Sequence, residues 1–183
     1  MNFDVAEYKG KIKRVVLSEE EIQRKIAEVG KQISEEYEGQ PLLLVSILNG
    51  AFVFMADLFR AIDIPCEIAF MVAKSYYAST ESSGEVTIKL DVNQDLSKYH
   101  VIVVEDIIDT GRTLSLVAKN LKERDPLSFK IVTLLDKPER RVVDLNADIS
   151  LFTIPDLFVI GYGLDYDEAY RNLPYIAEYD QGN

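Results

Sequence analysis

Apolar residues recur along this chain in two patterns, one typical of amphipathic helices and the other of buried strands. After Ser18 and Glu21, which match the Ser-x-x-Glu capping box, apolar residues return every three or four positions until about Gly39. This spacing predicts a helix, whereas continuous apolar runs predict strands buried on both faces. Helices are predicted at about 18–39, 52–62 and 110–124, and strands at 42–48, 66–73, 86–90, 101–104, 129–135 and 157–161.

The order of these elements predicts the fold class. Strands that alternate with helices favour an α/β protein with a mainly parallel, twisted sheet flanked by helices on both faces. The length of 183 residues and the hydrophobic content of 48% suit a single domain over residues 1–183. Residues 74–85 are rich in serine and lack apolar periodicity, so we expect them to form a mobile lid loop.

The charge and the cysteine content limit the possible partners and the cell compartment. The formal net charge of -11 argues against nucleic acid as a partner, because such binding depends on a basic surface. A phosphorylated substrate can still bind an acidic protein when a divalent metal masks its charge, so the composition predicts metal dependence. The single cysteine, Cys66, lies in an apolar run and suits a buried thiol in a reducing compartment. No signal-like segment or bilayer-spanning run is evident, so we expect a cytoplasmic protein with no membrane partner.

The most informative segment covers residues 101–114. An apolar β-branched run ends in Glu105 and Asp106, a third carboxylate follows at Asp109, and Thr-Gly-Arg-Thr then opens a predicted helix. Backbone N–H groups at such a strand-to-helix turn bind anions, and the helix dipole adds to the attraction. The carboxylates would repel the same anion and suit hydroxyl groups or a metal ion instead. The segment therefore predicts a sugar-phosphate site.

Residues 101–114 also resemble the 5-phosphoribosyl-1-pyrophosphate signature of the type I phosphoribosyltransferases. The order Glu-Asp-Ile-Ile-Asp-Thr-Gly-Arg-Thr is similar to that of the 6-oxopurine branch, the hypoxanthine-guanine phosphoribosyltransferases. A second stretch, Phe-Val-Ile-Gly-Tyr-Gly-Leu-Asp-Tyr at 158–166, is characteristic of the same branch. The resemblance covers nearly the whole chain, and it implies the type I fold with a small hood and a mobile lid loop.

The resemblance implies a donor site with Mg²⁺ as its cofactor. Asp109 would act as the general acid/base on a purine ring proton. The pyrophosphate loop would contain a cis peptide between Leu48 and Asn49, where many relatives have lysine in place of Asn49 and so gain a cation. The residues expected at the donor are Leu48, Asn49, Gly50, Glu105, Asp106, Asp109, Thr110, Gly111, Arg112, Thr113 and Arg171, with Ser75 and Tyr76 in the lid, and those expected at the metal are Glu105, Asp106 and Asp165.

The purine pocket is expected at the ends of two later strands. Lys137 matches the residue that donates to the purine 6-oxo group, and an ammonium suits this role because it donates but never accepts. Phe158 matches the side chain that stacks on the purine, and the backbone of Val159 matches the group that reads the base edge. Without the resemblance, Lys137 is most often a solvated charge and Phe158 a core residue.

The activity that the resemblance implies is a purine-salvage transfer. Hypoxanthine, and guanine as well, would react with 5-phosphoribosyl-1-pyrophosphate to give IMP or GMP and pyrophosphate. Two alternatives stay open: a transferase of the same fold that prefers xanthine, and a non-enzymatic RNA-binding regulator, which would need a basic face. The family also implies a homodimer or homotetramer.

Overall fold

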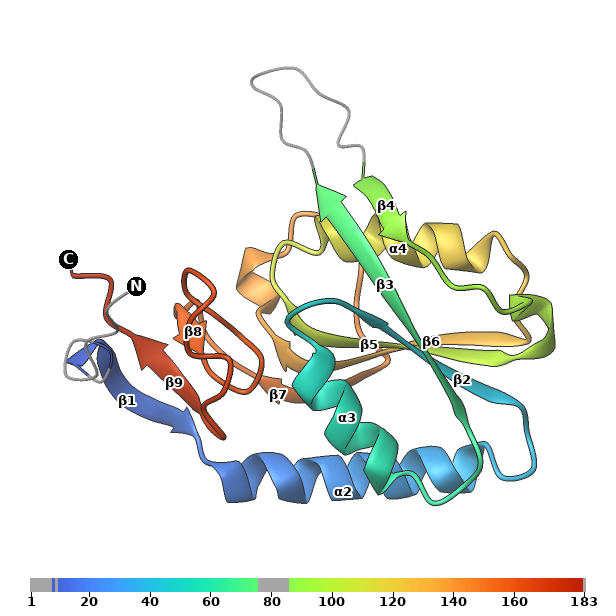
Figure 1. Cartoon of the computed structure of the whole chain (residues 1–183), viewed down its shortest axis with the longest axis horizontal. Coiled ribbons are helices and arrows are strands. Elements are labelled where there is room, and N and C mark those ends of the chain that lie inside the picture. The colour runs from blue at the N-terminus through green and yellow to red at the C-terminus, as the bar shows by residue number, and fades with distance from the viewer. Residues whose placement is uncertain (1–7, 9, 76–85, 183) are drawn as a thin grey trace.

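The computed structural model describes Tyr8, residues 10–75 and residues 86–182, which form two β-sheets and the helices that cover them (Figure 1). The helices are α2 (Glu19–Glu36), α3 (Phe52–Ala61) and α4 (Arg112–Lys122), with short 3-10 helices η1 (Leu96–Lys98) and η2 (Pro138–Arg140). The strands are β1 (Ile12–Leu17), β2 (Leu42–Ile47), β3 (Glu67–Ser75), β4 (Val86–Leu90), β5 (His100–Ile108), β6 (Ser128–Asp136), β7 (Ile149–Thr153), β8 (Val159–Ile160) and β9 (Ile176–Tyr179).

The larger sheet has the strand order β4-β3-β2-β5-β6-β7 and is parallel except at one edge. β2 pairs in parallel with β3 and β5, the pairs β5–β6 and β6–β7 are also parallel, and β4 runs antiparallel to β3. Helices α2 and α3 cover one face of this sheet and α4 covers the other (Figure 1). The predicted α/β fold, a mainly parallel sheet flanked by helices, is confirmed.

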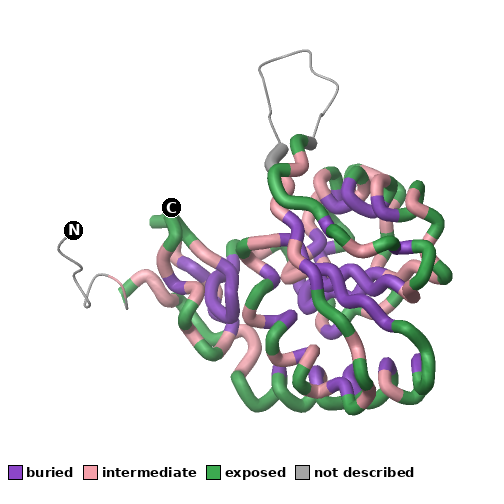
Figure 2. Tube along the Cα trace, turned by 45° about the vertical axis from the view of Figure 1, so that its right-hand side comes forward, coloured by how far each residue is buried: buried purple, intermediate pink, exposed green. Residues whose placement is uncertain are grey.

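The core consists of two main apolar clusters, one on each face of the larger sheet. Figure 2 shows the buried residues concentrated along its central strands. Alternate residues of β5 divide between the clusters: Ile102 and Val104 pack with α2 and α3, and Val101 and Val103 pack with α4. Because side chains alternate along a strand, this pattern decides which way the carboxylates at the end of β5 face.

The N-terminus of α2 is fixed by the capping box that the sequence predicts. The Glu21 N–H donates to Oγ of Ser18 at 3.2 Å, and the Ser18 N–H donates to Oε2 of Glu21 at 2.9 Å. The helix then buries Ile22, Ile26 and Ile33 against α3 and the sheet. Local sequence and tertiary packing agree at this helix, which explains why its start is predicted to the residue.

The prediction that residues 157–161 form a strand of the parallel sheet was wrong. Only Val159–Ile160 is extended, as β8, and it belongs to a separate sheet with the order β1-β9-β8, in which every pairing is antiparallel. The physical reason is that β7, which the hydrophobic pattern did not indicate, already occupies the edge beside β6. The next segment therefore pairs with β9 and forms a small second sheet beside the first (Figure 1).

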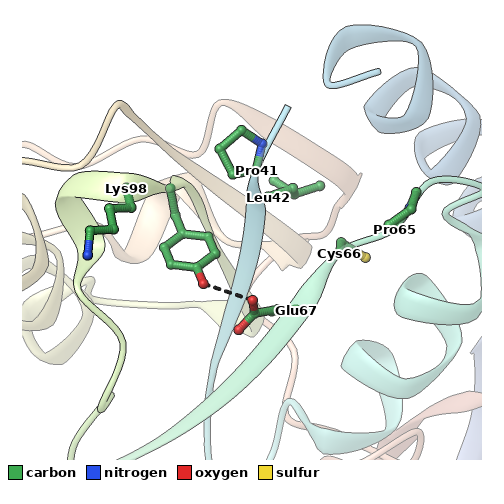
Figure 3. Close-up of a pocket in the computed structure, with 7 residues that line it drawn as sticks. Pro41, Leu42, Pro65, Cys66, Glu67 and Lys98 are labelled. Atoms are coloured by element: carbon green, nitrogen blue, oxygen red, sulfur yellow. Dashed lines mark hydrogen bonds between the residues drawn. The ribbon is translucent and has the colours of Figure 1, made fainter. Parts of the chain in front are cut away.

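A cavity of about 360 Å³ lies at the amino ends of β2 and β3. Leu42, Cys66 and Tyr99 are among the residues that line it, and the Tyr99 hydroxyl donates to Glu67 there at 2.8 Å (Figure 3). Cys66 is only half-buried, contrary to the prediction of a buried thiol, and this partial burial raises its pKa. The cavity is at the opposite end of the sheet from the predicted ligand site, which parallel strands place at their carboxyl ends.

Among the helices in the described part of the chain, none is both long and apolar enough to cross a membrane. Of the predicted lid, residues 74 and 75 complete β3, and residues 76–85, which include Tyr76, lie outside the described residues.

Candidate active site

Most of the predicted donor residues lie at the carboxyl ends of β2 and β5, and Lys137 follows β6, the next strand of the parallel sheet. β2 leads into residues 48–50, β5 carries Glu105 and Asp106 and leads into residues 109–111, and β6 leads into Lys137. Because the carboxyl ends of parallel strands open on one edge, these three segments lie side by side.

The turn after β2 contains the expected cis peptide bond between Leu48 and Asn49. The next residue, Gly50, lies against the carboxylate of Asp106, so that a Cβ atom at residue 50 would be 1.7 Å from Oδ2 of Asp106. Only a residue without a side chain permits this approach. The other oxygen of Asp106, Oδ1, accepts a hydrogen bond of 2.8 Å from the N–H of Ile107.

β5 extends past the end that the sequence predicts. It continues to Ile108 because β6 goes on pairing with it, from Glu105 opposite Thr133 to Ile108 opposite Asp136. The predicted end of the strand at residue 104 was therefore wrong, since Glu105 and Asp106 lie within β5 and project to opposite faces. Glu105 continues the side that packs on α4, and Asp106 continues the side of α3 and reaches Gly50.

Burial makes both of these carboxylates hard to ionise. The pKa of Glu105 lies well above its usual value because the group is desolvated and, secondly, because Asp106 lies next to it. Burial also raises the pKa of Asp106 to about 6; Arg171 opposes this rise and Asp165 adds to it. Oε2 of Glu105 is buried without a hydrogen-bond partner among the described residues. A ligand hydroxyl or a cation would supply that partner.

Residues 109–113 form a tight loop into α4. Gly111 is the N-cap with φ of 77°, and a Cβ atom there would lie 2.9 Å from Val143 and 3.0 Å from Arg141. Both the backbone conformation and the space therefore require glycine at this position. Gly111 gives α4 no side-chain cap, which leaves the first N–H groups of the helix to bind an anion. Thr110 and Thr113 flank this position and are half-buried, whereas Arg112 is exposed.

Asp165 and Arg171 form an ion pair in the segment between β8 and β9. Nη2 of Arg171 lies 3.0 Å from Oδ1 of Asp165 and 3.0 Å from Glu168, and Nη1 donates to the Gly163 carbonyl at 2.8 Å. The remaining oxygen of Asp165 accepts the Glu168 N–H at 2.9 Å. A metal ion bound directly by Asp165 would have to compete with Arg171. In the ranges the structure describes, no three His, Cys, Asp or Glu side chains are grouped to hold a metal, so Glu105, Asp106 and Asp165 do not form a single cluster.

Lys137 lies beside an exposed aromatic ring. Its side chain is buried, and Nζ donates to the Leu157 carbonyl at 2.6 Å while lying 3.8 Å from Oδ1 of Asp156. Phe158 follows with 40% of its surface exposed, and its ring meets Tyr166 edge-on with centroids 5.8 Å apart. Phe158 is therefore a surface ring rather than a core residue. Val159, by contrast, is buried in β8. A buried ammonium beside an open aromatic face suits a flat, polar heterocycle.

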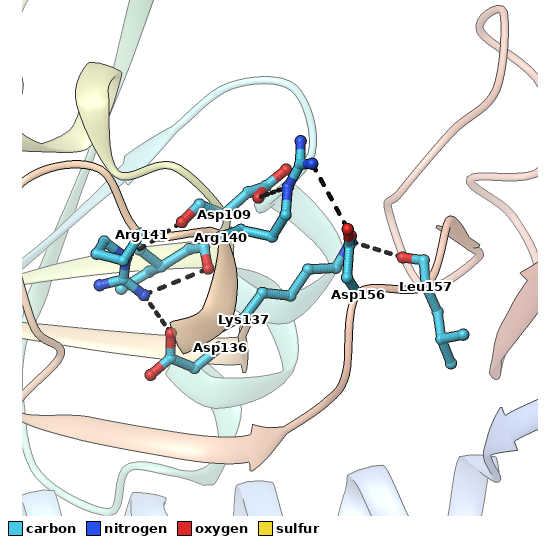
Figure 4. A network of polar contacts seen from close by, with 8 residues as sticks. Asp109, Asp136, Lys137, Arg140, Arg141, Asp156 and Leu157 are labelled. Atoms are coloured by element: carbon cyan, nitrogen blue, oxygen red, sulfur yellow. Dashed lines mark hydrogen bonds and ion pairs between the residues drawn. The ribbon is translucent and has the colours of Figure 1, made fainter.

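Two arginines that sequence reasoning missed hold Asp109 (Figure 4). Nε of Arg140 donates to Oδ1 of Asp109 at 3.0 Å, and Nη1 lies 3.5 Å from Oδ2 of Asp156. Nε of Arg141 donates to the backbone carbonyl of Asp109 at 3.1 Å, and its Nη2 pairs with Asp136. The hydrogen bond from Arg140 to Asp109 raises the pKa of the guanidinium. Their position in the sequence could have indicated a place at the site, because both arginines follow Lys137 within one turn of the chain.

The small sheet is attached to the helices by a polar contact that no sequence motif indicates. The Tyr162 hydroxyl donates to Asp57 on α3, and Gln23 on α2 donates to Asp57 at 2.8 Å and to the Tyr162 hydroxyl at 3.2 Å. Burial, followed by the bond to Asp57, raises the pKa of the Tyr162 phenol. The next residue, Gly163, has φ of 100°, and a Cβ atom there would lie 2.1 Å from the Gly50 carbonyl oxygen. The loop after β8 is thus fixed against the turn after β2.

Comparison with known proteins agrees with this geometry. Residues 16–167 match the model of the phosphoribosyl transferase domain family. The hypoxanthine-guanine phosphoribosyltransferase of Streptococcus pneumoniae is 52% identical over 166 residues, which cover 91% of this chain and 92% of that protein, and the Lactococcus lactis protein of the same name is 50% identical over 91% and 90%. Among solved structures, a hypoxanthine phosphoribosyltransferase from Staphylococcus aureus is 44% identical with a TM-score of 0.91, covering 98% of this chain and 97% of that one. A mutant of the Trypanosoma cruzi enzyme in a ternary substrates complex is 41% identical with a TM-score of 0.89, over 94% and 97%.

Proposed function

The chain belongs to the phosphoribosyl transferase family, and from this premise we propose that it transfers the 5-phosphoribosyl group of 5-phosphoribosyl-1-pyrophosphate to hypoxanthine and guanine. It is a transferase of the purine-salvage type, as its relatives are. One observation supports the assignment to these residues above others: near the carboxyl ends of the central strands lie a helix N-terminus suited to an anion, two buried carboxylates with raised pKa values, and a buried lysine bonded to the residue before an exposed aromatic ring.

The donor would occupy the loop into α4 and the end of β5. The N–H groups of residues 110–113, with the Thr110 and Thr113 hydroxyls, would hold the 5′-phosphate, while the side chain of Arg112 points to solvent. Glu105 and Asp106 would accept hydrogen bonds from the ribose hydroxyls, which would satisfy the unpaired Oε2 of Glu105. The backbone of residues 48–50 would face the pyrophosphate. Asn49 brings no charge there, so Arg171 is the cation placed to attract that group.

Mg²⁺ fits the donor site. Its preferred ligands are carboxylate and phosphate oxygens, and it commonly takes only one or two from the protein. A cation beside these groups would supply a partner for the buried Oε2 of Glu105 and would favour the ionised form of Asp106. Asp165 would help to hold a second Mg²⁺, and the metal would supply positive charge against the leaving pyrophosphate.

The base would lie between Lys137 and Phe158. The ammonium of Lys137 has three donors and uses one on the Leu157 carbonyl, so it can donate to the purine 6-oxo group as well. The same group has no acceptor for the exocyclic amine of adenine, which favours hypoxanthine and guanine. The Phe158 ring would stack on the purine, and the backbone of Val159 would read its edge.

Asp109 would handle the proton of the reaction. As the bond from C1′ of the ribose to pyrophosphate breaks, N9 of the purine forms the new bond, and a ring proton has to leave the base. The half-exposed carboxylate of Asp109 lies between the phosphate loop and Arg140, where it can accept a proton near N7. The lid predicted at residues 74–85, with Ser75 and Tyr76, would exclude water from the electron-poor C1′.

A substrate panel tests this function. The purified protein is incubated with 5-phosphoribosyl-1-pyrophosphate and hypoxanthine, guanine, xanthine or adenine, with and without Mg²⁺, and the nucleotide products are separated by chromatography. We expect IMP and GMP, no AMP, and no product in the presence of a chelator. The absence of turnover with every base would refute the proposal, and xanthine as the best substrate would refute the stated base preference.

Three further expectations belong with this proposal. The single transferase domain over residues 1–183 is supported by the family match over residues 16–167. A cytoplasmic location is supported by the lone, half-buried Cys66, and cell fractionation tests it. The homodimer or homotetramer implied by the family is tested by sedimentation equilibrium of the purified protein.

A further inference from the structure

The side chains of four residues form a line of alternating charge across the candidate active site. Arg140 contacts Asp109 at 3.0 Å and Asp156 at 3.5 Å, and Asp156 in turn lies 3.8 Å from Nζ of Lys137 (Figure 4). The two ends of this line are the proposed proton-handling group, Asp109, and the proposed base-reading group, Lys137. Arg140 is the member that joins the loop after β5 to the segment before β8.

The backbone fixes Arg140 relative to Lys137. Both lie on the 3-10 turn that begins after β6, and the Arg140 N–H donates to the Lys137 carbonyl at 3.1 Å. Pro138 within this turn restricts its conformation further. Arg141, the next residue, donates to the backbone carbonyl of Asp109 at 3.1 Å. Consecutive arginines therefore hold Asp109 at two points, the backbone by Arg141 and the carboxylate by Arg140.

A contribution to folding stability does not explain why Arg140 makes these two contacts. Its side chain is 47% exposed, and its partners Asp109 and Asp156 are 39% and 51% exposed. Ion pairs this open to solvent contribute little to folding. What the guanidinium does provide is a planar fork that reaches two carboxylates from one side chain, and a single ammonium lacks that fork. It also binds only Oδ1 of Asp109, which leaves Oδ2 for a ligand.

We propose that Arg140 is a positioning residue for the proton transfer: by bridging Asp109 and Asp156, it holds the Asp109 carboxylate at a fixed place relative to the base bound at Lys137. This inference rests on the proposed function, because it assigns Arg140 a role in that reaction. Arg140 does not touch the base and acts through Asp109. Since Arg141 also holds the backbone of the phosphate loop and the Leu157 carbonyl also holds the ammonium of Lys137, the loss of Arg140 affects the chemical step more than substrate binding.

A double-mutant cycle tests the proposal. Arg140→Gln is expected to lower kcat about 10-fold and to leave both KM values within about twofold, because a misplaced catalytic group slows the step without weakening ground-state binding. In an Asp109→Asn background the same change is expected to cost less than about twofold, since coupled residues are not additive. Arg140→Lys keeps the charge and is expected to recover part of kcat. An equal loss in both backgrounds, or a lysine variant as active as the unaltered protein, would overturn the proposal.

A matched control and a second readout separate this inference from the proposed function. Arg124→Gln breaks another arginine–carboxylate pair, the 2.6 Å contact with Asp91, at the far end of α4, and is expected to leave kcat unchanged. The ¹³C NMR signal of the Asp109 carboxyl carbon, assigned by its loss in Asp109→Asn, is expected to shift in Arg140→Gln and to stay in place in Arg124→Gln. An unshifted signal in Arg140→Gln would overturn the inference, whether or not the unaltered protein is active. Absence of turnover in the unaltered protein would instead refute the proposed function. Melting temperatures identify any variant that fails to fold, and Arg140→Lys then replaces Arg140→Gln in the cycle.

Discussion

The close packing of Asp106 against Gly50 makes Gly50→Ala an informative change. The new methyl group would lie 1.7 Å from Oδ2 of Asp106 and 2.7 Å from its Cγ, whereas real Cβ contacts essentially never fall below 3.0 Å. Oδ2 must therefore move by at least about 1.3 Å. The atom that moves is the end of a side chain rather than backbone, so the fold can accommodate the methyl group while the carboxylate leaves its place.

This displacement separates activity from stability. Moving a group at the reacting centre by about 1 Å can reduce the rate by a factor on the order of 10². We expect a loss of that size in kcat/KM for 5-phosphoribosyl-1-pyrophosphate, because Asp106 is proposed to bind the ribose. Overpacking costs about 1–3 kcal/mol, and each kcal/mol lowers the melting temperature of a chain of this size by roughly 2–4 °C. The variant should therefore melt somewhat earlier and remain folded at assay temperature.

Steady-state kinetics at varied donor concentration, together with calorimetry, measure both effects. The control is Gly10→Ala, because a Cβ atom at Gly10 meets nothing within 4 Å and we expect neither effect there. If Gly50→Ala kept kcat/KM within twofold of the unaltered protein, the position of Asp106 would not matter for the donor. The role assigned to the glycine after β2 would then be wrong.

Three other changes test single residues of the site. Asp109→Asn should lower kcat by about 10²–10⁴, the range for a general acid/base, and near-native turnover would remove Asp109 from that role. Lys137→Gln should lower kcat/KM for hypoxanthine about 10- to 100-fold, because a charged hydrogen bond contributes about 1.5–3 kcal/mol, and should bring hypoxanthine and adenine closer together; an unchanged ratio of the two would contradict the proposed reading of the 6-oxo group. Asp106→Asn should raise the melting temperature at pH 8 and change it little at pH 4: the pKa of Asp106, about 6 in place of 3.8, means that its ionisation destabilises the fold as the pH rises through this window. Scanning calorimetry at both pH values checks this sign, and equal shifts at both would contradict it.

The parts of the fold that the sequence predicts well are those in which local signals and packing agree. The Ser18–Glu21 capping box, the buried strand β2 and the glycine-containing loop at Gly111 each carry a local signature, and each appears where expected. The small sheet was not predicted because its strands give no periodic signal. β1 has no fully buried residue, and β8 is buried but only two residues long, so neither shows a period.

The site was predicted unevenly for a similar reason. Residues of a contiguous motif, such as Glu105, Asp106 and Asp109, can be identified as candidates from the sequence. The directions of their side chains could not be predicted, because they depend on how far β6 continues to pair with β5. Arg140 and Asp156 are 16 positions apart and interact only because η2 turns back toward the segment before β8. Contacts of this kind follow from tertiary structure and have no local pattern.

The approach of Gly163 to Gly50 has a consequence for how this enzyme can change over time. The proposed donor site lies on the larger sheet, whereas Val159 belongs to the smaller one and Phe158 directly precedes it. At Gly163 and Gly50 the loop after β8 meets the turn after β2 through main chain alone, so this contact sets no requirement on the exposed ring of Phe158. Selection can therefore change the side chain proposed to stack on the acceptor while the proposed donor site stays intact. A library that varies Phe158 together with Lys137, the proposed base-reading residue, is the economical route to a transferase with a different nucleobase preference.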